Sequence, residues 1–109
     1  MMIKTSNENK ASQCTDMASI RTEIDRIDRE VILLLGERYS FVKAASKFKN
    51  SPTQVKAEDR FNAMLKERRG WAEEQGLSAD LIEKIYRDLV TWFISEEMRH
   101  WSEQQPNLT

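Results

Sequence analysis

The feature that most constrains this chain is a long helical stripe of apolar side chains in its first half. Between residues 20 and 48 apolar side chains recur at steps of three and four, and they are Ile20, Ile24, Ile27, Val31, Leu34, Leu35, Phe41, Val42, Ala45 and Phe48. This near-heptad spacing predicts one continuous helix from about Asp16, a candidate N-cap, to Lys49 or Asn50. Gly36 lies inside the pattern, but one Gly costs only about 1 kcal/mol in a helix and does not end it.

A helix of this length is too long for a compact chain of 109 residues. About 33 residues at about 1.5 Å each form a rod of roughly 50 Å, whereas a domain of about 100 residues has a radius of gyration of about 13 Å. Much of the stripe would contact water unless a second chain covered it. We therefore expect an intertwined homodimer.

Two further helices account for the remainder of the folded region. Residues 50–54 (NSPTQ) interrupt the helical pattern, because Pro52 disfavours a helical conformation at the preceding residue. A second helix is expected over residues 56–75, ended by Gly76, and a third from the candidate N-cap Ser78 to about Gln104.

The predicted fold class is therefore all-α, with three helices per chain, one of them very long. We expect residues 16–103 to form one helical domain. Residues 1–15 lack apolar periodicity and are expected to be a disordered N-terminal arm, and residues 104–109 a C-terminal tail.

Composition excludes several classes of protein. Only 3 Gly and 2 Pro leave too little turn chemistry for an all-β sandwich or barrel, and a net charge of −1 gives no global footprint for nucleic acid. No apolar run is long enough to span a membrane, and residues 1–10 do not read as a secretory signal. A cytoplasmic protein is expected.

Cys14 and His100 are the only residues of their types, so we expect no metal site and no Cys–His nucleophile.

Two cations share one face of the first predicted helix. Arg38 continues the apolar stripe, and Lys49 follows eleven residues later, at about the same angle around the axis. A buried charge needs an acidic partner, a route to solvent or an anionic ligand. Both side chains could converge on a small dianion. Alternatively, Arg38 covers apolar surface with its stem, and Lys49 interacts with the helix dipole.

Three other charged residues, Arg21, Glu97 and Arg60, are each compatible with two orientations. Arg21 lies seventeen residues before Arg38, too far along a straight helix to reach the same small ligand within one chain. It could reach that ligand from an antiparallel helix of a second chain. Glu97 continues the inward spacing of the third helix, and Arg60 begins the second; each is also compatible with an ordinary surface or salt-bridge role.

Several segments together resemble the helical chorismate mutases. Residues 20–28 read IRTEIDRID, and the spacing onward to Arg38, to Lys49 and to residues 58–60 (EDR) is similar to that family. Residues 42–49 (VKAASKFK) and 71–77 (WAEEQGL) are more similar to its isochorismate pyruvate lyase branch. The resemblance covers about residues 16–102.

This resemblance implies a dimer of interlocked helices with two sites and no cofactor. It implies that Arg38 binds one substrate carboxylate and that Arg21 of the partner subunit binds the other. Lys49 would donate to the ether oxygen and help to close the site, and Arg60 would add positive charge near a carboxylate. The implied reaction cleaves isochorismate to salicylate and pyruvate, as in the biosynthesis of salicylate and siderophores.

Two residues depart from the mutase pattern. Phe61 stands where the mutases carry a Glu that binds the ring hydroxyl of chorismate, which favours the lyase branch. Glu97 stands where many members carry Gln. Only a protonated carboxyl can donate to the ether oxygen, and burial and nearby cations shift its pKa in opposite directions.

Three functions follow from this sequence. The first is an isochorismate pyruvate lyase with a weak chorismate mutase side activity, and the second is a chorismate mutase that forms prephenate. The third is a non-catalytic helical dimer or regulatory module, in which Glu97 has disabled the site. The first is our prediction.

Overall fold

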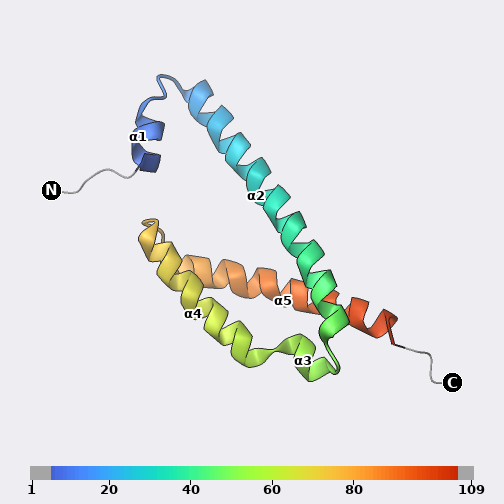
Figure 1. Cartoon of the computed structure of the whole chain (residues 1–109). Coiled ribbons are helices and arrows are strands. Elements are labelled where there is room, and N and C mark those ends of the chain that lie inside the picture. Colours follow the sequence, from blue (N-terminus) through green and yellow to red (C-terminus); the bar gives the residue numbers. More distant parts are fainter. Residues whose placement is uncertain (1–5, 106–109) are drawn as a thin grey trace. The chain divides into compact units, whose positions relative to one another are not determined.

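A computed structural model of the chain describes residues 6–105, and all of its regular structure is helical within that range. The elements are α1 (Ser6–Ser12), α2 (Met17–Ala45), η1 (Ser46–Phe48, a 3₁₀-helix), α3 (Pro52–Lys56), α4 (Glu58–Glu74) and α5 (Ala79–Glu103) (Figure 1). The predicted all-α class is confirmed. The long helices α2, α4 and α5 correspond to the three predicted ones, whereas α1, η1 and α3 were not predicted. None of the helices in this part of the chain is long and apolar enough to cross a membrane.

The chain divides into two compact units within α2, residues 1–38 and residues 39–109. In the first unit α1 lies in the segment that we expected to be a disordered arm, so that expectation does not hold for residues 6–12. Residues 1–5 of the arm and 106–109 of the predicted tail lie outside the described residues. Asp16 is the predicted N-cap of α2, since its Oδ1 accepts a hydrogen bond from the Ser19 amide at 2.7 Å.

The apolar stripe of α2 is exposed in the single chain. No residue of α2 is buried, and Ile24, Val31 and Leu34 each expose about half or more of their surface. Gly36 lies within the helix without ending it, as predicted. An isolated protein normally buries such a stripe, so its exposure distinguishes this helix from α4 and α5, which have buried residues.

The prediction that the first helix continues to Lys49 or Asn50 is wrong. The α-helix ends at Ala45, η1 follows, and Lys49 has an extended backbone (φ −97°, ψ 139°). The Ser46 hydroxyl donates to the Lys43 carbonyl at 2.6 Å, and the Lys49 amide donates to the Ser46 carbonyl at 3.3 Å, which tightens this turn. The angular relation calculated for Arg38 and Lys49 on one straight helix therefore does not apply.

The predicted second helix, residues 56–75, is also corrected. Ser51 caps a separate helix, α3, by accepting the Gln54 amide at 3.2 Å, and Pro52 occupies its first position. Ala57 then adopts a left-handed conformation (φ 44°), which divides α3 from α4. This conformation costs a non-glycine residue about 1–2 kcal/mol. The left-handed residue turns the chain between α3 and α4, which the apolar spacing alone predicts as one helix.

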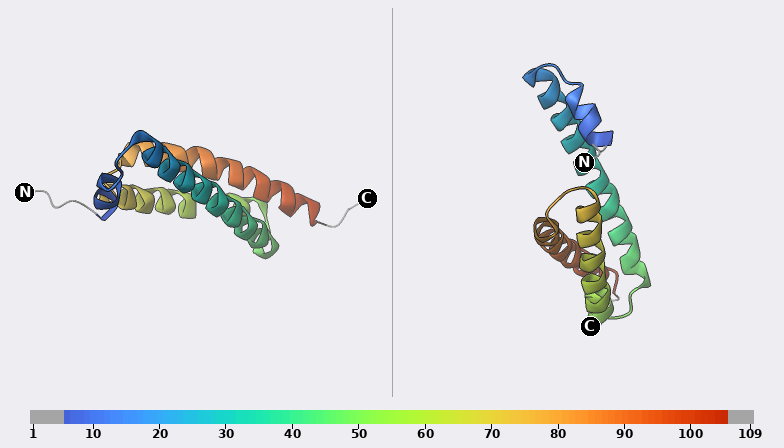
Figure 2. Two further views of the ribbon diagram at one scale, coloured as in Figure 1. Left: turned by 90° about the horizontal axis from the view of Figure 1, so that it is seen from above. Right: turned by 90° about the vertical axis from the view of Figure 1, so that its left-hand side faces the viewer.

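Helices α4 and α5 form a hairpin that holds most of the buried core of the second unit (Figure 2). Gly76 (φ 72°) ends α4 as predicted, since its amide donates to the Glu73 carbonyl and the Leu77 amide donates to the Ala72 carbonyl. Ser78 caps α5 through the Leu81 amide, also as predicted. The side chains that pack between the two helices are Phe61, Met64, Leu65, Tyr86, Val90 and Ile94.

Candidate active site

The structure brings together two predicted site residues that are far apart in the sequence, Lys49 and Glu97. The Lys49 ammonium Nζ lies 3.5 Å from Glu97 Oε1. Lys49 follows η1, whereas Glu97 lies in the last third of α5 and exposes only 6% of its surface. The predicted inward orientation of Glu97 is confirmed, and its neighbour is a cation, as its salt-bridge interpretation allowed.

Lys49 is held at both its side chain and its backbone. Its ammonium donates to the Gln54 carbonyl in α3 at 3.0 Å, in addition to the ion pair with Glu97. Its own carbonyl accepts a hydrogen bond from Trp101 Nε1 at 2.8 Å. Two other helices, α3 and α5, therefore hold this one residue through three contacts. The extended backbone at Lys49 turns it away from the helical path.

The Glu97 carboxyl group is buried, and its pKa is shifted from the ordinary value. Burial raises its pKa above the ordinary value, and the nearby Lys49 ammonium opposes this shift without cancelling it. Its Oε1 atom has no hydrogen-bond partner among residues 6–105, because the ammonium is at ion-pair distance only. The sequence left the direction of this pKa shift open, and in the structure the pKa is raised. Only the protonated form of the carboxyl group can donate a hydrogen bond.

The two predicted carboxylate-binding arginines belong to the first unit. Arg21 is exposed near the start of α2, and Arg38 is half-buried at the end of that unit. Both lie in the helix whose apolar stripe is exposed. Neither arginine takes part in the contact between Lys49 and Glu97.

Arg60 and Phe61 lie near the start of α4 with different surroundings. Arg60 is exposed and lines a surface hollow together with Thr53, Lys56, Ala57, Glu58 and Asp59. Phe61 is half-buried, packs against the core of the α4–α5 hairpin and lies 5.9 Å below the Arg87 guanidinium. An aromatic ring at this position offers no acceptor for a substrate hydroxyl.

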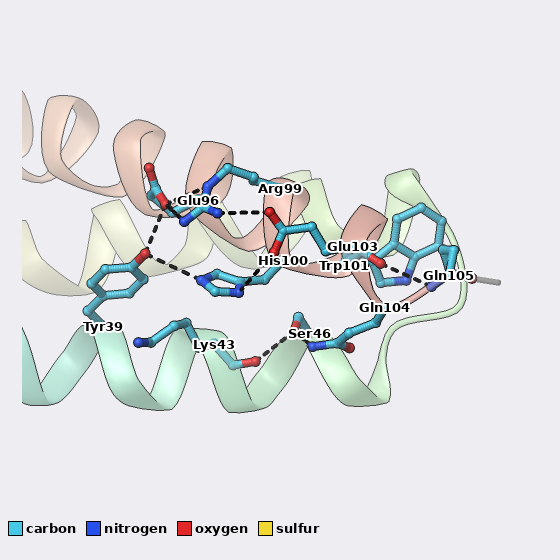
Figure 3. Close-up of polar contacts among 10 residues, drawn as sticks. All are labelled: Tyr39, Lys43, Ser46, Glu96, Arg99, His100, Trp101, Glu103, Gln104 and Gln105. Atoms are coloured by element: carbon cyan, nitrogen blue, oxygen red, sulfur yellow. Dashed lines mark hydrogen bonds and ion pairs between the residues drawn. The ribbon is translucent and has the colours of Figure 1, made fainter. Parts of the chain in front are cut away.

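A second group of polar contacts beside Lys49 was not predicted. Figure 3 shows Tyr39 and Ser46 facing α5, where Tyr39 Oη donates to Glu96 Oε2 at 2.8 Å and Gln104 Nε2 donates to Ser46 Oγ at 3.3 Å. Lys43 also lies over the Tyr39 ring. These contacts join the end of α2 and η1 to α5. The spacing of residues in the sequence does not predict these contacts, because each depends on a single polar atom at a place where two helices cross.

Comparison with known proteins assigns this arrangement to a family. The model of chorismate mutase type II matches residues 20–98, which include Arg21, Arg38, Lys49 and Glu97. The chain belongs to the chorismate mutase type II family. The predicted resemblance is confirmed.

Two relatives of this chorismate mutase type II chain differ greatly in how much of their length it covers. An isochorismate pyruvate lyase of Pseudomonas aeruginosa is 46% identical over 88 residues, which are 81% of this chain and 87% of that protein. A T-protein of Haemophilus influenzae is 42% identical over 72 residues, which are 65% of this chain but only 19% of that protein. The lyase therefore matches along nearly its whole length.

Glu97 should make the stability of this family member depend on pH. The pKa of the Glu97 carboxyl group is higher in the folded protein than in the unfolded chain. Its protonation therefore stabilises the folded protein fully at pH values below the unfolded-state pKa. This stabilisation is lost as the pH rises through the folded-state pKa. We therefore expect Glu97→Gln to raise the free energy of unfolding at neutral pH. The difference should vanish in acid, as measured by urea unfolding followed by circular dichroism.

An exposed glutamate provides the control for this change in charge. Glu73→Gln in α4 removes the same charge from the surface and should show no such pH-dependent gain. Destabilisation by Glu97→Gln at neutral pH would contradict the prediction, because it would mean that attraction to Lys49 outweighs the burial of the carboxylate.

Proposed function

We propose that this chain is an isochorismate pyruvate lyase, which eliminates pyruvate from isochorismate to give salicylate. The observation that carries the proposal is the 46% identity to a lyase that the chain matches over 87% of that protein's length. The contact between Lys49 and the buried Glu97 supports it, because it provides a cation and an acid in one place. We propose that the salicylate formed is used in siderophore biosynthesis.

In the proposed reaction the ether C–O bond of isochorismate breaks, and one ring hydrogen passes to the enolpyruvyl carbon that becomes the methyl group of pyruvate. Negative charge grows on the ether oxygen as the bond lengthens. Lys49 donates to that oxygen, and protonated Glu97 adds a second donor. No residue forms a covalent bond to the substrate and no cofactor is required, so the protein acts by orientation and electrostatics.

The two carboxylates of the substrate need cations beyond Lys49. We propose that Arg38 binds one of them and that Arg21 of the partner subunit binds the other, with Arg60 adding positive charge. Guanidinium groups suit this role because they donate two parallel hydrogen bonds to a carboxylate. Phe61 would contact the ring, and its lack of an acceptor supports isochorismate over chorismate as the main substrate.

A homodimer is part of the same proposal. The apolar stripe of α2 is exposed in the single chain, and its near-heptad spacing suits pairing with the same helix of a second copy. Pairing would cover the stripe and would bring Arg21 of the partner subunit to the site. The expected cytoplasmic location stays a prediction.

A second candidate function is chorismate mutase, which the matched family favours by its description. We expect it as a weak side activity, since the same cations would bind chorismate. Separate incubations with isochorismate and with chorismate decide between the two activities. Salicylate release with little prephenate is the expected result, and prephenate formation alone would overturn the lyase proposal. Turnover of neither substrate would leave a non-catalytic helical dimer.

Protonation of Glu97 should also appear in the pH profile of the lyase. If protonated Glu97 donates to the ether oxygen, kcat of the wild type should fall as the pH rises through the raised pKa of this group. A Gln amide donates at every pH. Glu97→Gln should therefore keep or raise kcat at neutral pH and flatten the profile, whereas a large loss would assign the carboxylate another role.

A further inference from the structure

The last turns of α5 contact both ends of Lys49. Glu97 faces the ammonium at 3.5 Å, and Trp101, one helical turn later, donates from Nε1 to the Lys49 carbonyl at 2.8 Å. Residues four apart lie on the same face of a helix. One face of α5 thus positions the backbone and the side chain of the same residue.

The adjoining turn is attached to the same end of α5. Gln104 Nε2 donates to the hydroxyl of Ser46, the first residue of η1, and that residue exposes only 1% of its surface. Ser46 in turn donates to the Lys43 carbonyl, as Figure 3 shows. Phe48, by contrast, is 83% exposed, so apolar packing of that side chain does not fix the turn. The polar contacts from α5 therefore have a large part in placing Lys49.

We infer that Trp101 is a positioning residue, whose indole N–H fixes the Lys49 backbone so that the ammonium meets the ether oxygen. The inference rests on the proposed lyase function. Lys49 has a flexible four-carbon side chain, so an unfixed backbone would spread its ammonium over many positions. Displacement of a catalytic group by about 1 Å can cost about 100-fold in rate, and Trp101 restricts that displacement.

Trp101→Phe tests the inference, because it keeps an aromatic ring and removes the N–H. We expect kcat for isochorismate to fall about five- to tenfold with little change in KM, since Trp101 acts on the reacting oxygen through Lys49 and not on substrate carboxylates. Trp71→Phe is the matched control. Trp71 is a half-exposed indole on α4 that stacks with Arg68, and its substitution should leave kcat unchanged.

Trypsin cleavage gives a measurement that does not depend on activity. The Trp101 bond is made to the carbonyl of the peptide bond between Lys49 and Asn50, which is a bond that trypsin can cut. Trp101→Phe should speed cleavage after Lys49 about five- to tenfold, read by mass spectrometry, while cleavage after the exposed Lys66 in α4 stays the same. Replacement of Trp101 by benzothienylalanine, which has nearly the same shape but no N–H, should reproduce both effects if the Phe variant folds poorly.

The outcomes separate the inference from the proposed function. If the wild type cleaves isochorismate and the two Trp101 variants match it in kcat and in cleavage after Lys49, the positioning role is wrong. If the wild type lacks lyase activity, the function fails and the role in catalysis fails with it. Faster cleavage after Lys49 in that case would still support the contact between Trp101 and the Lys49 backbone, but not a role for it in catalysis. Equal loss of kcat in Trp71→Phe would also overturn the inference.

Discussion

Lys49→Ala should lower kcat for isochorismate about 100- to 1,000-fold, the usual effect of removing a donor from a developing oxyanion. The ammonium is the only proposed donor to the ether oxygen that is charged, and its position is set by Gln54, Glu97 and Trp101. Steady-state release of salicylate or pyruvate measures the effect. A smaller effect on KM is expected, because the carboxylates are assigned to arginines.

Two further variants make the Lys49 result specific. Lys47→Ala removes an exposed ammonium from η1 and should leave kcat unchanged. Lys49→Ala also leaves the Glu97 carboxyl buried without its neighbouring cation, which could disturb the fold. The double variant Lys49→Ala with Glu97→Gln replaces that carboxyl group by an amide that is neutral at every pH. Recovery of activity in the double variant would show that Lys49 acts only by neutralising Glu97.

Spacing along the chain predicted the helices well where burial or a cap is local. The caps at Asp16, Ser78 and Gly76 lie where the sequence predicted them, because each uses hydrogen bonds to residues within a few positions. The end of α2 was predicted too late. Phe48 continues the apolar spacing, but it is exposed and lies in a 3₁₀ turn, so periodicity alone did not report the change in backbone.

The candidate site depended on information that spacing does not contain. Glu97 was predicted to face inward from its helical series, but its contact with Lys49 joins residues from distant parts of the chain, and only the family resemblance linked them. The Trp101 contact was missed because it ends on a backbone carbonyl, which every residue has. The direction of the Glu97 pKa also required the structure, since it depends on how far burial outweighs one cation.

Mixed dimers of Arg21→Ala and Lys49→Ala should regain activity that neither variant has alone. If Arg21 acts across the interface, a mixed dimer contains one site with both residues intact and one site with neither. Random reassembly makes half of the dimers mixed, so the mixture should recover about a quarter of wild-type activity. Purified mixed dimers, selected with two different tags, should recover about half.

The control for this experiment separates a composite site from simple stabilisation by a partner chain. Lys49→Ala mixed with the double variant Arg21→Ala, Lys49→Ala cannot form any site that contains Lys49, so that mixture should stay inactive. Were Arg21 to act within its own chain, the first mixture would stay inactive as well, because each chain would carry one defect in its own site. Recovery in the first mixture alone therefore requires that Arg21 and Lys49 of one site come from different chains, which the exposed apolar stripe of α2 makes physically reasonable.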